Sequence, residues 1–177
     1  GLRISVNVSA RQLHRPEFVD DVLAALAASG LPPWRLELEL TESELVDDIE
    51  QAITRLQALR AGGVRIALDD FGTGYASIGF LRRFRFEKLK LDRSLIEIAG
   101  ADEGSRAMMI SSIALARALN MGVAAEGVET EEQAELVRLA GCDQIQGWLY
   151  YRALPAPEID RLLEEQQHRD RADEEAA

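Results

Sequence analysis

The stretch Leu36-Glu37-Leu38-Glu39-Leu40 alternates apolar and acidic residues, so a β-strand here places its leucines on one face and both glutamates on the other. The same alternation recurs in other short segments of this 177-residue chain, and six such strands are expected. Each would have one apolar face and one small or polar face. Their polar C-terminal ends carry Asn7, Glu39, Asp69 with Asp70, Lys90, Glu126 and Gln146.

Carboxylates dominate this set of strand-end side chains. Ionised groups brought together inside a protein are costly unless they are paired or bind a metal ion. An excess of acids favours the metal. The strand ends therefore indicate a site for divalent cations.

Segments with helical periodicity lie between the strands. Each has a recognisable beginning or end, such as Thr130 as an N-cap and Gly141 as a stop. The expected helices run from near Pro16 to Gly30, from Asp47 or Asp48 to Gly62, from Asp102 to Asn120, from Thr130 to Gly141, and onward from Pro155 to Pro157. This strand–helix alternation predicts an α/β fold with a parallel sheet and helices packed outside it.

Two parallel architectures fit this pattern: an open doubly wound sheet and a closed (β/α)8 barrel. A polar residue at the end of every strand is typical of a barrel mouth, so we expect a TIM-like barrel. Such a barrel usually needs about 250 residues, and about six βα units are present here. Residues 1–163 are thus expected to be the C-terminal two-thirds of a barrel, and 164–177 a charged, disordered tail.

The composition is typical of a globular domain of the cytoplasm, since 47% of residues are hydrophobic and no apolar run approaches the roughly 20 residues of a membrane span. The net charge of −11 argues against binding DNA or RNA polymers. The single cysteine, Cys142, excludes an internal disulfide, and we interpret it as a small buried residue at a turn.

Six runs along the chain together resemble the successive motifs of EAL domains. They are SVNVS (5–9), ELTE (39–42), DDFGTGY (69–75), KLDRS (90–94), EGVET (126–130) and GCDQIQG (141–147). EAL domains are cyclic di-GMP phosphodiesterases with a TIM-like barrel. The resemblance implies hydrolysis of this bacterial second messenger to linear pGpG with two Mg²⁺ or Mn²⁺ ions.

The resemblance also implies roles for individual residues. Asn7, Glu39 and Asp69 would bind one metal ion, and Asp69 and Asp70 the second, with help from Glu126. Lys90 would orient the attacking water and favour its deprotonated form. Asp92 would contact the substrate or the water network, and Gln146 would complete the polar ring.

The segment after Asp70 has the glycine-rich sequence of a mobile loop, which includes Gly72, Thr73 and Gly74. In the family, Glu42 looks like a brace for this loop, which carries substrate contacts and, with the adjacent helix, part of a homodimer interface. Glu129 would be either a supporting hydrogen-bond partner or an acid at a helix N-terminus.

The sequence departs from the family pattern in one respect, because it lacks the Glu-Ala-Leu motif and its following arginine. In the family this motif should lie upstream of residue 1. The chain alone is therefore expected to be inactive or very weak, whereas the intact parent would be an enzyme with an upstream sensor, GGDEF domain or membrane segment. Two alternatives stay open: a non-hydrolytic cyclic di-GMP receptor, and another divalent-metal barrel enzyme such as an enolase-like lyase.

Overall fold

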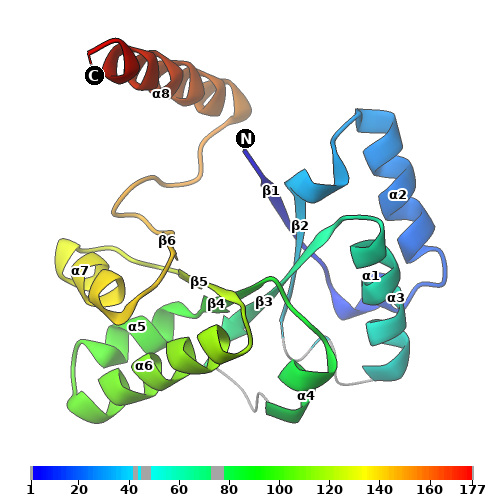
Figure 1. Ribbon diagram of the computed structural model, residues 1–177, viewed down its shortest axis with the longest axis horizontal. Coiled ribbons are helices and arrows are strands. Elements are labelled where there is room, and N and C mark those ends of the chain that lie inside the picture. Colours follow the sequence, from blue (N-terminus) through cyan, green and yellow to red (C-terminus); the bar gives the residue numbers. More distant parts are fainter. Residues whose placement is uncertain (1, 42–43, 45–48, 73–77, 177) are drawn as a thin grey trace.

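The computed structural model describes residues 2–41, 44, 49–72 and 78–176, which form a curled sheet with helices around it (Figure 1). All neighbouring strands pair in parallel, in the order β1-β2-β3-β4-β5-β6. The strands are β1 (Ile4–Asn7), β2 (Leu36–Thr41), β3 (Arg65–Phe71), β4 (Lys88–Leu91), β5 (Gly122–Ala125) and β6 (Gln144–Ile145). This sheet is a half-barrel and confirms the prediction of about six units of a TIM-like barrel.

Helices connect the strands and pack on the outside of the curl, and one further helix follows the last strand. They are α1 (Ala10–Leu13), α2 (Phe18–Ser29), the 3-10 turn η1 (Pro33–Arg35), α3 (Ile49–Ala61), α4 (Ile78–Arg83), α5 (Arg93–Ala99), α6 (Glu103–Ala118), α7 (Glu131–Ala140) and α8 (Ala156–Ala176). In Figure 1, α1 to α3 lie to the right of the sheet in this view and α5 to α7 to the left.

Local sequence explains the helix ends. Thr130 forms a capping box with Gln133 at the start of α7, and Gly141 ends that helix with φ 96°. Gly30 ends α2 in the same left-handed conformation, with φ 68°. A side chain rarely adopts this conformation, so glycine at these two positions stops each helix where the sequence predicts.

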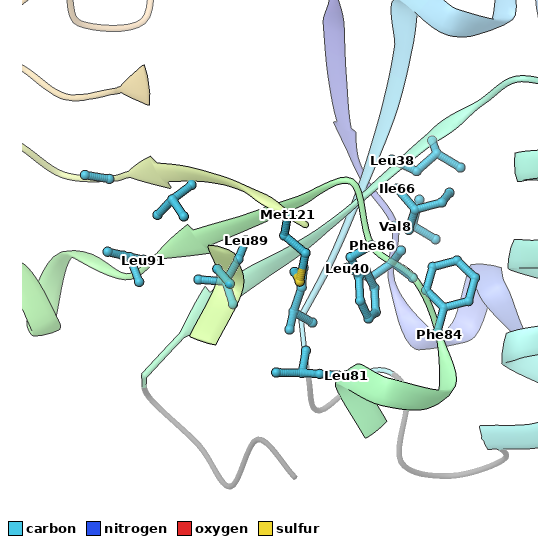
Figure 2. Packing of buried hydrophobic residues seen from close by; sticks show 14 of the residues in the cluster. Val8, Leu38, Leu40, Ile66, Leu81, Phe84, Phe86, Leu89, Leu91 and Met121 are labelled. Carbon is cyan, nitrogen blue, oxygen red and sulfur yellow. The ribbon is translucent and has the colours of Figure 1, made fainter. Parts of the chain in front are cut away.

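The hydrophobic core lies between the outer face of the sheet and the helices. Figure 2 shows Leu38 and Leu40 of β2 with Ile66 of β3, beside Phe84 and Phe86 from the segment before β4. The two phenylalanine rings make an edge contact with centroids 4.7 Å apart. Since the leucines of β2 face this core, its glutamates must face the inside of the curl.

Strand β1 is an edge of the described sheet, and all four of its residues are exposed. Ile4 and Val6 line an apolar groove of about 720 Å³, together with Val22 and Leu26 of α2 and Leu36 of β2. Both side chains remain substantially exposed, at 51% and 44%. A further strand or helix would find apolar contacts here.

The final helix differs from the sequence-based expectation of disorder over 164–177. Helix α8 continues to Ala176 and extends away from the sheet (Figure 1). The segment is rich in alanine, glutamate, glutamine and arginine, which have high intrinsic helix propensity. Among the described residues, every helix is too short or too polar to cross a bilayer.

Candidate active site

Four neighbouring strands bring charged side chains together on the inside of the curl. Glu39 lies in β2, Asp69 in β3 and Lys90 in β4, and Glu126 follows β5. Parallel strands present their carboxyl ends at one edge, so these residues meet at the mouth of the half-barrel. Glu39, Asp69 and Lys90 are buried, with exposed fractions of 7%, 8% and 4%.

The Lys90 ammonium group lies among three carboxylates. Its Nζ atom is 2.6 Å from Glu39 Oε2, 3.1 Å from Asp69 Oδ1 and 2.6 Å from Glu126 Oε1. Burial opposes the charge, but hydrogen bonds to Glu126 and Glu39 outweigh it and raise the pKa of Lys90 above its ordinary value. Lys90 is therefore a fixed cation that can donate hydrogen bonds and cannot accept a proton near neutral pH.

The strand geometry changes at Asp70. Consecutive residues of a regular strand point to opposite faces, yet Asp69 and Asp70 both reach the mouth. Asp70 has φ 54°, and the β3–β4 register shifts between Leu68 and Phe71. Aspartate tolerates this left-handed backbone better than most residues. The bulge thus turns two adjacent carboxylates towards one place.

Asp69, Asp70 and Glu126 form a group suited to a cation. One carboxylate oxygen from each lies within 4.8 Å of the other two. Burial, followed by the charges of Asp69 and Asp92, raises the pKa of Asp70. Burial also raises the pKa of Glu126, with Asp69 adding to the effect and Lys90 opposing it. A bound divalent cation would relieve this like-charge repulsion, and carboxylate oxygens are suitable ligands for Mg²⁺ or Mn²⁺.

Two amide side chains named from the sequence lie beside this group. Asn7 is paired with Glu39 across the β1–β2 ladder and is exposed. Gln146 follows β6 and lines a cavity of about 590 Å³ with Glu39 and Lys90. Both therefore border the mouth.

Asp92 makes a capping contact that its sequence-based role did not include, whereas the hydrogen bond of Glu129 is compatible with one of its two predicted roles. Asp92 is the N-cap of α5, and its carboxylate accepts hydrogen bonds from the backbone and hydroxyl of Ser94. Glu129 accepts a 2.6 Å hydrogen bond from Arg93. An aspartate immediately before a helical segment is a typical capping signal, which was present in the sequence.

The loop after Asp70 is only partly described. Gly72 has φ 110°, and a side chain there would press against Leu95 at 3.2 Å. Glu42, Thr73 and Gly74 lie outside the described residues, so their roles stay predictions. Cys142 lies in the turn between α7 and β6, where burial raises its thiol pKa to about 11 and makes it a poor nucleophile.

A second buried charge cluster lies deeper inside the curl and was missed from the sequence. Glu37 is 1% exposed and is paired with Lys88, with Arg65 and Ser5 beside it. The alternation in β2 and β4 places Glu37 and Lys88 on this face, but their pairing depends on register across β3, which local sequence does not reveal.

Comparisons with known proteins agree with the geometry. The family description "EAL domain" matches residues 1–153. Cyclic di-GMP phosphodiesterase NbdA of Pseudomonas aeruginosa is 42% identical over 162 residues, which are 92% of this chain and 21% of NbdA. An uncharacterized signaling protein of Caulobacter vibrioides is 46% identical over 91% of this chain and 20% of its own length. The chain thus spans about a fifth of the length of these curated relatives.

Solved structures show the same fold. The PaMucR phosphodiesterase in complex with c-di-GMP is 41% identical with a TM-score of 0.84, covering 89% of this chain and 64% of that one. A manganese/cy-diGMP complex of Klebsiella pneumoniae BlrP1 is 32% identical with a TM-score of 0.77, covering 83% and 38%. The sequence motifs, the half-barrel and its acid-lined mouth agree with these matches: the chain belongs to the EAL domain family.

Proposed function

We propose that this chain supplies most of the active site of a metal-dependent phosphodiesterase that hydrolyses cyclic di-GMP to linear pGpG. The observation that carries the proposal is the Lys90 ammonium held by three carboxylates next to the Asp69, Asp70 and Glu126 group. NbdA and the PaMucR structure are described as a cyclic di-GMP phosphodiesterase and a phosphodiesterase c-di-GMP complex. The assignment extends that activity to this chain.

The acids at the mouth would hold two divalent ions. Asn7, Glu39 and Asp69 would bind one, and Asp69, Asp70 and Glu126 the other, with Mg²⁺ and Mn²⁺ both chemically suitable. When bound, such ions stabilise the attacking and leaving oxygens of an in-line displacement at phosphorus. Their charge would also offset the chain's net charge of −11, which would otherwise repel an anionic substrate.

Lys90 would position the attacking water. A permanent cation cannot remove the proton, but its hydrogen bonds can hold the water oxygen and its charge favours a deprotonated nucleophile. Glu126, which contacts Lys90, would hold the second ion or its bound water. Asp70 would share in holding the second ion, and Gln146, which follows β6, would contact the substrate.

The setting of this activity follows from the proposed substrate. Cyclic di-GMP is an intracellular messenger, so the domain would act in the cytoplasm, as part of a longer protein with a sensor or GGDEF domain. Further strands would pair with β1, whose open edge carries Ile4 and Val6. A homodimer through the loop after Asp70 and the adjacent helix stays a prediction of the family resemblance, because residues 73–77 lie outside the described part.

The decisive test measures pGpG release from cyclic di-GMP by the longer protein that contains this chain. Hydrolysis is expected with Mg²⁺ or Mn²⁺ and should stop in excess chelator. Binding of cyclic di-GMP without turnover under all metal conditions would assign the protein to the non-hydrolytic receptors instead. Turnover that persists in chelator would contradict the metal assignment.

A further inference from the structure

Below the mouth, the inside of the half-barrel holds a second ion pair. Lys88 Nζ contacts Glu37 Oε1, and we call this contact the lower ion pair. The contact of Lys90 with Glu39 is the upper ion pair. Glu37 is 1% exposed, so its charge is almost fully removed from water. A buried carboxylate in this position depends on its cationic partner.

The two ion pairs are repeats of one arrangement. Each joins β2 to β4, and partners in both pairs are 51 residues apart in the chain. Both cross β3, where the fully buried Ala67 is the register partner of Glu39 on one side and of Lys88 on the other. Its methyl group is short enough to let long side chains from the flanking strands meet over it.

Among the described residues, the only other cation paired with Glu37 is Arg65, and that ion pair is longer than the one with Lys88. Arg65 Nε is 3.7 Å from Glu37 Oε2, too far for a hydrogen bond, and neither atom has another hydrogen-bond partner in the described part. Ser5 Oγ donates to Glu37 Oε1 over 3.4 Å, which is a weak contact. Without Lys88, Glu37 would keep only the longer ion pair with Arg65 and the weak hydrogen bond from Ser5.

Lys90 is the next cation along β4. Residues i and i+2 of a strand lie about 7 Å apart on the same face, a distance that a flexible lysine stem can span. A Glu37 carboxylate that lacked Lys88 would therefore compete with Glu39 and Glu126 for the Lys90 ammonium. Lys88 removes that competition.

We propose that Glu37 and Lys88 are positioning residues, whose pairing keeps the Lys90 ammonium at the mouth of the half-barrel. The lower ion pair lines the same cavity as Glu39 and Lys90, and in this proposal it acts on catalysis through Lys90. This inference rests on the proposed phosphodiesterase function, in which Lys90 orients the attacking water.

The test compares Lys88→Met, Glu37→Gln/Lys88→Met and Lys88→Arg in the longer, hydrolytically competent protein. Lys88→Met should lower kcat by about tenfold or more, the scale of a misplaced catalytic group, with KM nearly unchanged. The double variant, which removes the competing charge, should recover most of the lost kcat. Lys88→Arg, which keeps a cation at this position, should lower kcat only slightly. Arg117→Met, which removes the exposed ion pair with Asp143 on the outside of the fold, is the matched control and should keep wild-type kcat.

A crystal structure of Lys88→Met provides a readout that does not need turnover. Lys90 Nζ is expected to move from Glu126 towards Glu37. If Lys88→Met does not fold, Lys88→Gln replaces it in both measurements, with a smaller loss of kcat that Glu37→Gln again restores.

A wild-type kcat for Lys88→Met, a loss that the double variant does not restore, or an unmoved Lys90 would each overturn the positioning role. Absence of turnover by the wild-type protein would instead contradict the phosphodiesterase assignment, while the structure of Lys88→Met would still test the position of Lys90.

Discussion

Asp70 is a residue whose position opposes stability. Its backbone is left-handed, its carboxylate faces Asp69 and Glu126, and its pKa is raised by burial and neighbouring charge. Asparagine keeps the tolerated backbone conformation and removes the charge. In chelator near neutral pH, Asp70→Asn should therefore raise the Tm of this chain by about 2–4 °C, as expected for roughly 1 kcal/mol.

Asp70→Ala is the matched control, because it loses the same charge but places an unfavourable residue at φ 54°. Its Tm should lie below that of Asp70→Asn. Calorimetry in chelator measures the Tm of both variants. A lower Tm for Asp70→Asn than for wild type would contradict a destabilising repulsion between Asp70 and its neighbouring carboxylates.

The raised pKa values also give a pH dependence for metal binding. Without metal, the folded pKa values of Asp70 and Glu126 lie above their ordinary values of 3.8 and 4.5, so their ionised forms oppose folding. This cost is present at pH above the folded pKa values and is relieved as pH falls towards the ordinary ones. Protons therefore compete with a divalent ion.

Mn²⁺ should raise the Tm more at about pH 7.5 than at about pH 5, because binding requires ionised carboxylates. Thermal unfolding with and without Mn²⁺ at each pH measures the difference. The rise in Tm caused by Mn²⁺ should be much smaller in Asp70→Asn. An equal rise in Tm at both pH values would exclude Asp70 and Glu126 as the main ligands.

Glu39 and Asp69 test the proposed metal ligands by activity. In the longer protein, Glu39→Ala or Asp69→Ala should lower kcat by at least about 100-fold, since the loss of supporting groups around metal ligands alone costs 10–100-fold. Glu135→Ala, which breaks an exposed ion pair with Arg138 on α7, is the control and should be unaffected. Wild-type turnover by either ligand variant would remove that residue from the metal site.

Among the elements, α5 connects the site to the fold through its N-cap residue. Asp92 caps this helix, and asparagine caps helices about as well as aspartate. Asp92→Asn should keep wild-type stability, whereas Asp92→Ala should lose about 1 kcal/mol of unfolding free energy. Chemical denaturation measures both.

The kcat of Asp92→Asn then separates two roles for this carboxylate. Unchanged kcat would leave capping as its role, and a large loss in a stable protein would support the contact with substrate or water that the family resemblance implies.

Elements were predictable from the sequence where local residues determine them. Thr130, Gly141 and Gly30 act within one turn of chain, so their helix ends follow from the sequence. The faces of the strands follow from alternation, which identified Glu39 and Lys90 as partners of one site. Pairing across strands does not follow: the contact of Glu37 with Lys88 requires the register of three strands and a small residue at Ala67 between them.

For the whole molecule, the open edge at β1 determines how the chain behaves alone. The groove beside Ile4 and Val6 is apolar, and an exposed strand edge can pair with a second copy. This chain should therefore associate with increasing concentration, and Ile4→Lys should reduce the association. Light scattering measures this association. Leu139→Lys, at an exposed site on α7, is the control and should leave the association unchanged. Strictly monomeric wild-type chain at high concentration would contradict this expectation.

The bulge at Asp70 has an evolutionary consequence. If Asp70 serves the proposed reaction while opposing folding, a lineage relieved of selection for hydrolysis would gain stability by exchanging that acid for its amide. The first step away from catalysis is thus thermodynamically downhill and leaves the rest of the half-barrel intact. Domains of this architecture should lose turnover readily while keeping a surface shaped for the nucleotide, which makes an enzyme of this kind a ready ancestor of a sensor.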